Sequence, residues 1–185
     1  MTKQTEHTPY QPWVDHYPDG IDYFAEIDTT PVPTRIDRAV KEHASLVALD
    51  FLGAETTYTE MGDQIERMAG ALQKELGLKK GSRVALLLPN TPFFPVIYYA
   101  ALKIGATIVN CNPLYTHSEL THILKNSDAD ILVTTDLKLT LEKAEKLMQE
   151  GMANKLVVSH FPTALPTLKK FLFKIFKGKD LATLS

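Results

Sequence analysis

Residues 84–92 have the sequence VALLLPNTP, which joins a run of aliphatic residues to a turn and to the start of a helix. An uninterrupted apolar run of this length is typical of a strand that is buried on both faces. Thr91-Pro92 is typical of a helix start, because proline lacks a backbone N–H and is tolerated in the first turn. The stretch therefore predicts a buried strand that leads directly into a helix.

Three further apolar runs follow at steps of about 24 residues. They occupy residues 107–110, 131–134 and 156–159. Connections of this length have room for a helix, and strand–helix–strand units of this kind place parallel strands in one sheet with right-handed crossovers. The sequence therefore predicts an α/β fold, an open and mainly parallel sheet with helices on both faces.

The intervals between these runs carry residues that start and end helices. Gly105 is expected to end the first helix, and Asp136 and Gly151 bracket the third. Thr116 and Glu119 have the spacing of a capping box, in which each side chain accepts a hydrogen bond from the other residue's backbone N–H. Each interval is therefore expected to contain one helix.

A hairpin and a helix are expected before the first of these strands. Residues 45–52 and 55–58 are two short runs separated by a glycine, which predicts an antiparallel hairpin. Thr59 is the expected cap of a helix whose apolar residues recur at helical spacing, and Gly77 is its expected end.

Composition divides the chain into three parts. Closely spaced prolines predict an extended arm over residues 1–33, because proline supplies no backbone donor to a regular ladder. Residues 34–160 form the α/β block, and residues 161–185 contain no further strand pattern. The open edge of such a sheet predicts either a local cap or a larger fold of which this chain is a piece. The open edge and the arm also predict self-association as a homodimer.

Overall composition excludes several classes of protein. With 44% hydrophobic and 23% charged residues, the chain is an ordinary globular domain, and its net charge of −2 argues against a nucleic-acid partner. One cysteine excludes a disulfide framework and indicates a reducing compartment. The polar N-terminus and the short apolar runs predict neither a signal peptide nor a transmembrane helix. We therefore expect a cytoplasmic protein.

The stretch from Leu165 to Lys179 is basic and contains no acidic residue. Its lysines are Lys169, Lys170, Lys174, Lys177 and Lys179. If residues 165–176 are helical, their apolar side chains form one stripe and the lysines fill much of the opposite face. Such a tail is expected either to lie on an anionic membrane, at the inner face of the cell membrane, or to pack on the rest of a larger fold.

The common catalytic and phosphate-binding motifs are absent from the sequence. It contains no G-x-x-x-x-G-K-[ST] loop, no G-x-G-x-x-G after a strand and no G-x-S-x-G elbow. Cys111 is interpreted as a small apolar core residue. His117 and His122 point to different sides of a helix, so they are interpreted as solvated residues that do not share a metal. Asp128 and Asp130 mark a turn into the next strand.

Four short strings of sequence say more about the protein's family than the spacing of its strands and helices. They are TYTEM at 57–61, LGLKKGSRVA at 76–85, LKIGA at 102–106 and NPLYT at 112–116. Together they resemble the opening of the adenylate-forming ligase superfamily. The string NPLYT followed by Glu119-Leu120 is most similar to bacterial long-chain fatty acid–CoA ligases, and the resemblance extends from Trp13 to about Lys179.

The resemblance implies a parent enzyme that activates a fatty acid with ATP and magnesium to an acyl-adenylate, releases pyrophosphate, and transfers the acyl group to coenzyme A. The family's phosphate loop, its nucleotide motifs and its small C-terminal domain have no counterpart in residues 1–185. We therefore expect an N-terminal fragment that is inactive alone and that binds ATP, magnesium and CoA poorly, while the missing domains of the parent enzyme bind fatty acid and CoA.

Neither a catalytic residue nor a cofactor or metal ligand is assigned from the resemblance. The motif residues are expected to be scaffold residues, namely Thr59, Gly105, Asn112, Pro113 and Tyr115. The membrane-surface candidates are Lys169, Lys170, Lys174 and Lys177. Two alternatives stay open: a non-enzymatic, membrane-associated α/β binding module, and a CoA ligase for shorter or aromatic acids.

Overall fold

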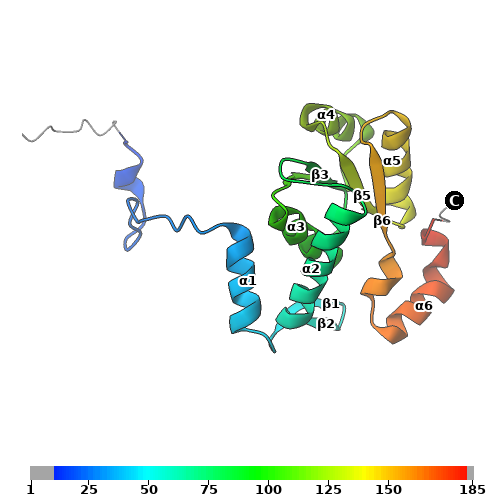
Figure 1. The fold of residues 1–185 in the computed structure, drawn as a ribbon, viewed down its shortest axis with the longest axis horizontal. Coiled ribbons are helices and arrows are strands. Elements are labelled where there is room, and N and C mark those ends of the chain that lie inside the picture. The colour runs from blue at the N-terminus through cyan, green and yellow to red at the C-terminus, as the bar shows by residue number, and fades with distance from the viewer. Residues whose placement is uncertain (1–10, 183–185) are drawn as a thin grey trace, which may run out of the picture. The chain divides into compact units, whose positions relative to one another are not determined.

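The computed structural model describes residues 11–182 (Figure 1). The chain divides into two compact units, Met1–Thr30 and Pro31–Ser185. The first unit contains the 3-10 turn η1 (Val14–His16) and a small aromatic group. Within this group the Trp13 indole N–H donates a hydrogen bond to the Tyr23 hydroxyl at 3.0 Å, and the rings of Tyr17 and Tyr23 meet edge to face. The described part of this unit is therefore held by local turns and aromatic contacts.

The second unit begins with a helix that the sequence analysis did not predict. Helix α1 (Val32–Glu42) starts one residue before the expected end of the arm, with Pro31 as its N-cap and Pro33 in its first turn. Prolines are tolerated there because the first N–H groups of a helix have no intrahelical partner. The two prolines therefore start a helix instead of continuing the arm.

The hairpin prediction is confirmed by strands β1 (Val47–Phe51) and β2 (Ala54–Thr57), which pair antiparallel. Helix α2 (Tyr58–Lys74) follows directly, but the expected cap was wrong by two residues. Thr57 and Glu60 form the capping box, and the hydroxyl of Thr59 instead donates to the Ala44 carbonyl at 3.0 Å. The capping residue must have an extended backbone, and Thr57 has it because it ends β2.

The predicted parallel sheet is confirmed. Its strands are β3 (Arg83–Leu86), β4 (Thr107–Asn110), β5 (Ile131–Thr135) and β6 (Lys155–Ser159). They pair in parallel in the order β4-β3-β5-β6. Helices α3 (Phe93–Lys103), α4 (His117–Ser127) and α5 (Lys138–Gln149) connect them. The chain is thus an α/β protein with helices on both faces of the sheet (Figure 1).

Alternate residues of β3 enter two different cores. Val84 and Leu86 pack with α2 and α3, whereas Ala85 and the following Leu87 pack with α4 and α5. All four residues are fully buried. A strand that is covered on both faces explains why this segment is apolar at every position.

The predicted ends of the connecting helices are mostly confirmed. Gly105 follows α3 with φ +77°, and Thr116 and Glu119 form the capping box of α4. Asp136 is the exception, because the N-cap of α5 is Leu137 and has no side-chain cap. The carboxylate of Asp136 instead accepts a hydrogen bond from Phe161 N–H at 2.8 Å and pairs with His160.

After β6 the chain forms the 3-10 turn η2 (Phe161–Ala164), helix α6 (Thr167–Lys177) and the 3-10 turn η3 (Gly178–Asp180). Leu165 was expected inside the helix but precedes it and is buried. The next residue is Pro166, and a residue before proline is disfavoured in helical conformation. The basic helix is therefore shorter at its start than the sequence predicted.

Candidate functional site

A hollow of about 670 Å³ lies at the carboxyl edge of the parallel sheet. It is lined by the loop after β3, the loop after β4 and the start of α5. The chain runs from β3 outward to β4 and then back across β3 to β5, so the strand order reverses beside β3. Ligands of open α/β sheets bind outside the carboxyl ends of the strands at such a reversal. The hollow is therefore the candidate functional site.

The lining of this hollow is apolar and amide-rich. Asn90, Asn110 and Asn112 contribute amides, while Leu114 and Leu139 are largely exposed at its rim. None of the lining residues carries a formal charge at neutral pH. The hollow can therefore hold an uncharged, partly apolar group with hydrogen bonds from the amides.

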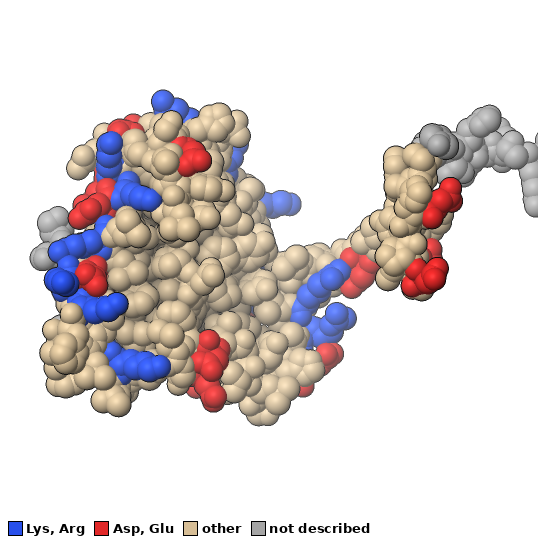
Figure 2. All heavy atoms as spheres, turned by 180° about the vertical axis from the view of Figure 1, so that it is seen from behind, with Lys and Arg blue, Asp and Glu red and all other residues tan. Residues whose placement is uncertain are grey.

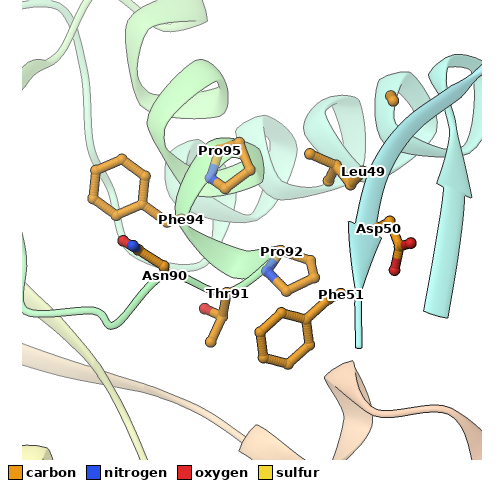
Figure 3. Close-up of a pocket in the computed structure, with 9 residues that line it drawn as sticks. Leu49, Asp50, Phe51, Asn90, Thr91, Pro92, Phe94 and Pro95 are labelled. Atoms are coloured by element: carbon orange, nitrogen blue, oxygen red, sulfur yellow. The ribbon is translucent and has the colours of Figure 1, made fainter. Parts of the chain in front are cut away.

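A second hollow of about 350 Å³ adjoins the first, and Figure 3 shows its lining. Asn90 and Phe94 line both hollows. On the far side, Leu49 and Phe51 come from β1, so the hairpin closes the second hollow against the start of α3. The loop after β3 thus separates two neighbouring cavities.

The motif residues Asn112, Pro113 and Tyr115 form a tight turn at the rim of the first hollow. The Asn112 side-chain oxygen accepts from Leu114 N–H at 2.9 Å. The half-buried Lys143 of α5 donates from Nζ to the carbonyls of Pro113 at 2.6 Å and Tyr115 at 2.9 Å. The Asn112 side chain and Lys143 thus hold this turn, and Lys143 is a positioning residue that the sequence analysis missed.

Replacing Lys143 by methionine is expected to loosen this turn without unfolding the protein. The change removes two charge-assisted hydrogen bonds of a half-buried ammonium, so the free energy of unfolding should fall by about 1–2 kcal/mol. Hydrogen exchange of the Leu114 and Tyr115 amides should accelerate. Lys146→Met, on the exposed side of the same helix, is the matched control and should change neither quantity. Unchanged exchange in K143M would contradict the assigned role.

The motif at residues 102–106 contributes to helix packing at a distance from both hollows. Lys103 forms ion pairs with Asp37 of α1, at 2.7 Å, and with Glu66 of α2. Desolvation lowers the pKa of Lys103, but the hydrogen bonds and charges of these two carboxylates outweigh it and the pKa is raised. Gly105 has φ +77°, which L side chains rarely adopt, and an added Cβ would also lie 3.0 Å from Cγ of the flexible Lys80 side chain, so backbone conformation is the main reason for glycine here.

Asp136 and His160 end neighbouring strands and meet at the same edge of the sheet. The Asp136 carboxyl side chain is 3% exposed and the His160 side chain is 47% exposed, so water reaches one partner of the pair. The buried hydroxyls of Thr135 and Thr140 lie 2.9 Å apart beside this pair. Asp136 directly follows β5 and His160 directly follows β6. These positions were the signal available in the sequence, since the carboxyl ends of parallel strands meet at one edge.

The other titratable candidates have structural roles. Burial raises the pKa of the Cys111 thiol to about 11, so it is protonated at neutral pH and fits the interpretation as a core residue. The interpretation of His117 as simply solvated was wrong, because its Nε2 lies 2.8 Å from the Glu150 carboxylate. Among the described residues, no group of three acidic, histidine or cysteine side chains is placed to bind a metal ion.

The first hollow does not fit a nucleoside triphosphate with its magnesium ion. Such a group needs cationic side chains or clustered backbone N–H groups for the phosphates, and carboxylates for the metal. The lining residues include no Lys, Arg, Asp, Glu or Gly, and the Lys143 ammonium already donates to two carbonyls. The lining of this hollow thus lacks the side chains that such a cofactor needs.

The tail lysines lie apart from these hollows. Lys169 donates to the Leu52 carbonyl at 2.7 Å, Lys170 is half-buried and Lys177 is exposed, while the side chain of Lys174 lies outside the described residues. Figure 2 shows Lys and Arg side chains mixed with Asp and Glu along the edge of the second unit that carries α6. No helix within residues 11–182 is both long enough and apolar enough to cross a bilayer.

Comparison with known proteins gives a consistent result. Residues 36–177 match the family model described as AMP-binding enzyme. The long-chain-fatty-acid–CoA ligase of Escherichia coli O157:H7 is 34% identical over 170 residues, covering 89% of this chain and 30% of that protein. The long-chain-fatty-acid–CoA ligase of Bacillus subtilis strain 168 is 28% identical over 165 residues, covering 89% of this chain and 29% of that protein.

Solved structures agree on the fold. The Mycobacterium tuberculosis fatty acyl CoA synthetase superposes with a TM-score of 0.63 at 23% identity, covering 70% of this chain and 26% of that one. The N-terminal subdomain of Klebsiella oxytoca NpsA superposes with a TM-score of 0.54 at 29% identity, covering 56% of this chain and 26% of that one. The chain spans about 30% of the length of the curated relatives it matches. By its sequence match over residues 36–177 and its parallel α/β fold, the chain belongs to the AMP-binding enzyme family.

Proposed function

We propose that this chain is the N-terminal part of a long-chain fatty acid–CoA ligase. The parent enzyme would convert fatty acid, ATP and CoA to acyl-CoA, AMP and pyrophosphate through an acyl-adenylate, with magnesium. The observation that carries this proposal is the 34% identity to a long-chain-fatty-acid–CoA ligase over 89% of the chain. The match covers 30% of that relative's length, which supports the view that other parts of the enzyme bind the substrates.

We further propose that the 185-residue chain is inactive alone. Adenylate formation needs groups that neutralise the triphosphate, and the uncharged lining of the carboxyl-edge hollow provides none. The contacts of Asn112 and the backbone conformation of Gly105 support a scaffold role for these motif residues of the second unit. Substrate binding and chemistry are therefore assigned to the remainder of the parent enzyme.

The test is an acyl-CoA assay with the 185-residue chain, palmitate, ATP, magnesium and CoA. The expected result is no thioester above the level without protein, while the Escherichia coli relative of full length forms product under the same conditions. Palmitoyl-CoA formed by the chain at a rate near that of this relative would refute the inactivity. With a longer form of the protein, a preference for octanoate or benzoate over palmitate would refute the long-chain assignment and support the alternative ligase.

Membrane attachment through α6 is a second candidate function. The observation that favours it is the exposed apolar stripe of α6 beside lysines that have no acidic neighbour in the helix. Anionic vesicles should sediment the chain, since each lysine near anionic headgroups contributes about 1 kcal/mol. Lys→Glu changes at Lys169, Lys170 and Lys174 should abolish sedimentation. Absence of sedimentation of the unmodified chain would reject the candidate.

A further inference from the structure

A groove of about 450 Å³ lies between α6, the η2 turn and the tip of the β1–β2 hairpin. Its apolar lining residues are Leu52, Phe161, Leu165, Leu172, Phe173 and Phe176. The remaining lining residues are two lysines, Lys169 and Lys177. The groove shares no lining residue with either hollow beside the loop after β3.

The floor of the groove is built by packed aromatic rings. The Phe161 ring lies with its centroid 6.1 Å from that of Phe51 on β1 and 5.3 Å from that of Phe173 on α6. Leu165 beside them is 8% exposed. These contacts hold α6 against the hairpin and η2, so the groove is formed before any ligand binds.

The rim of the groove is positively charged. Lys169 donates to the Leu52 carbonyl at 2.7 Å, which fixes one ammonium at the rim without neutralising its charge. Across the described part of the chain, the ion pairs include neither Lys169 nor Lys177. No acidic residue occurs between Leu165 and Lys179 to compensate these charges. An apolar groove whose rim lysines form no ion pair among the described residues is complementary to an aliphatic chain with an anionic head.

We propose that this groove binds one molecule of a single-chain amphiphilic anion, with the chain on the aromatic floor and the anionic head at Lys169 and Lys177. A fatty carboxylate and a lysophospholipid phosphate share this chemistry. The proposal goes beyond the functions proposed above, because binding here requires neither catalysis nor a bilayer. A volume of about 450 Å³ lies within the usual range of small-molecule sites.

The same helix offers matched controls. Leu168 and Phe171 are 69% and 62% exposed and do not line the groove, whereas Leu172 does. A ligand that merely coats exposed apolar side chains depends equally on Leu168 and Leu172. A ligand that occupies the groove depends on Leu172 alone.

The experiment is isothermal titration of the 185-residue chain with laurate and with 1-lauroyl lysophosphatidate, both below the concentration at which they form micelles. We expect saturable binding of one molecule per chain for at least one ligand, and the tighter ligand identifies the preferred head. Leu172→Ser and the pair Lys169→Glu with Lys177→Glu should each weaken binding about tenfold or more. Leu168→Ser should leave the affinity within about twofold of the unmodified chain.

Three results would overturn the proposal. If dodecanol binds as tightly as laurate and lysophosphatidate, the lysines have no role in binding. Equal losses of affinity in L168S and L172S would indicate that the ligand coats exposed apolar side chains of the helix. Absence of saturable binding of either ligand would also overturn it. Circular dichroism reports whether each variant folds. If L172S does not fold, Lys177→Glu alone still decides the outcome, since the Lys177 side chain lines the groove and forms no hydrogen bond or ion pair among the described residues.

Discussion

Replacing Leu132 by alanine is expected to lower the free energy of unfolding by about 2–5 kcal/mol. Leu132 lies on β5, one of the two inner strands of the sheet, is fully buried, and packs with residues of α4 and α5. Truncation removes apolar surface from the core and leaves a cavity that closely packed neighbours fill only in part. Since small domains are stable by about 5–15 kcal/mol, the change should be evident as a lower urea midpoint in circular dichroism.

Leu139→Ala is the matched control for this prediction. Leu139 is 61% exposed at the start of α5, so its truncation should change the free energy of unfolding by less than about 0.5 kcal/mol. A similar loss in both variants would contradict the assignment of β5 as the centre of the core.

Replacing His160 by alanine is expected to lower the free energy of unfolding by about 2 kcal/mol, more than its 47% exposed side chain would suggest. The reason is its partner, since the Asp136 carboxylate is buried and, among the described residues, keeps only the Phe161 N–H as donor after the change. Breaking a fully buried pair costs more than this, but here water reaches the carboxylate through the space left by the imidazole. Urea denaturation of H160A provides the measurement.

A double-mutant cycle separates the pair from other effects of the truncation. Asp136→Asn removes the buried charge, so His160→Ala should cost at least about 1 kcal/mol less in that background than in the unmodified chain. Additive losses would show that the two side chains do not act as a pair. A loss below about 0.5 kcal/mol in H160A would contradict the role of His160 in compensating the carboxylate.

Local features of the fold were predictable from the sequence. The Thr116–Glu119 capping box and the glycine after α3 involve residues close together in the chain, so their spacing alone predicts the hydrogen bond or the backbone conformation. The cap of α2 shows the limit of such patterns. Thr57 and Thr59 are both plausible caps by type, and only the extended backbone at the end of β2 selects Thr57.

The candidate site was less predictable than the fold. The string NPLYT marked the turn at the rim of the hollow, but its contact with Lys143 spans 28 residues to Tyr115 and depends on how α5 packs beside the loop. The pairing of Asp136 with His160 likewise depends on β5 and β6 lying side by side in register. A pattern of residue types carries no information on which of several distant partners a side chain meets.

The sequence by itself determined two things, the α/β class with buried parallel strands and the resemblance to adenylate-forming ligases. Both follow from strand periodicity, helix caps and motif strings, which are local properties of the chain. Only the tertiary structure decided the strand order β4-β3-β5-β6, which creates the hollow at the carboxyl edge. It also decided that the basic helix packs one side on the hairpin, where Lys169 meets a carbonyl 117 residues away. The physical reason is that burial of apolar surface drives these elements together without regard to separation in sequence, so the resulting contacts follow from packing.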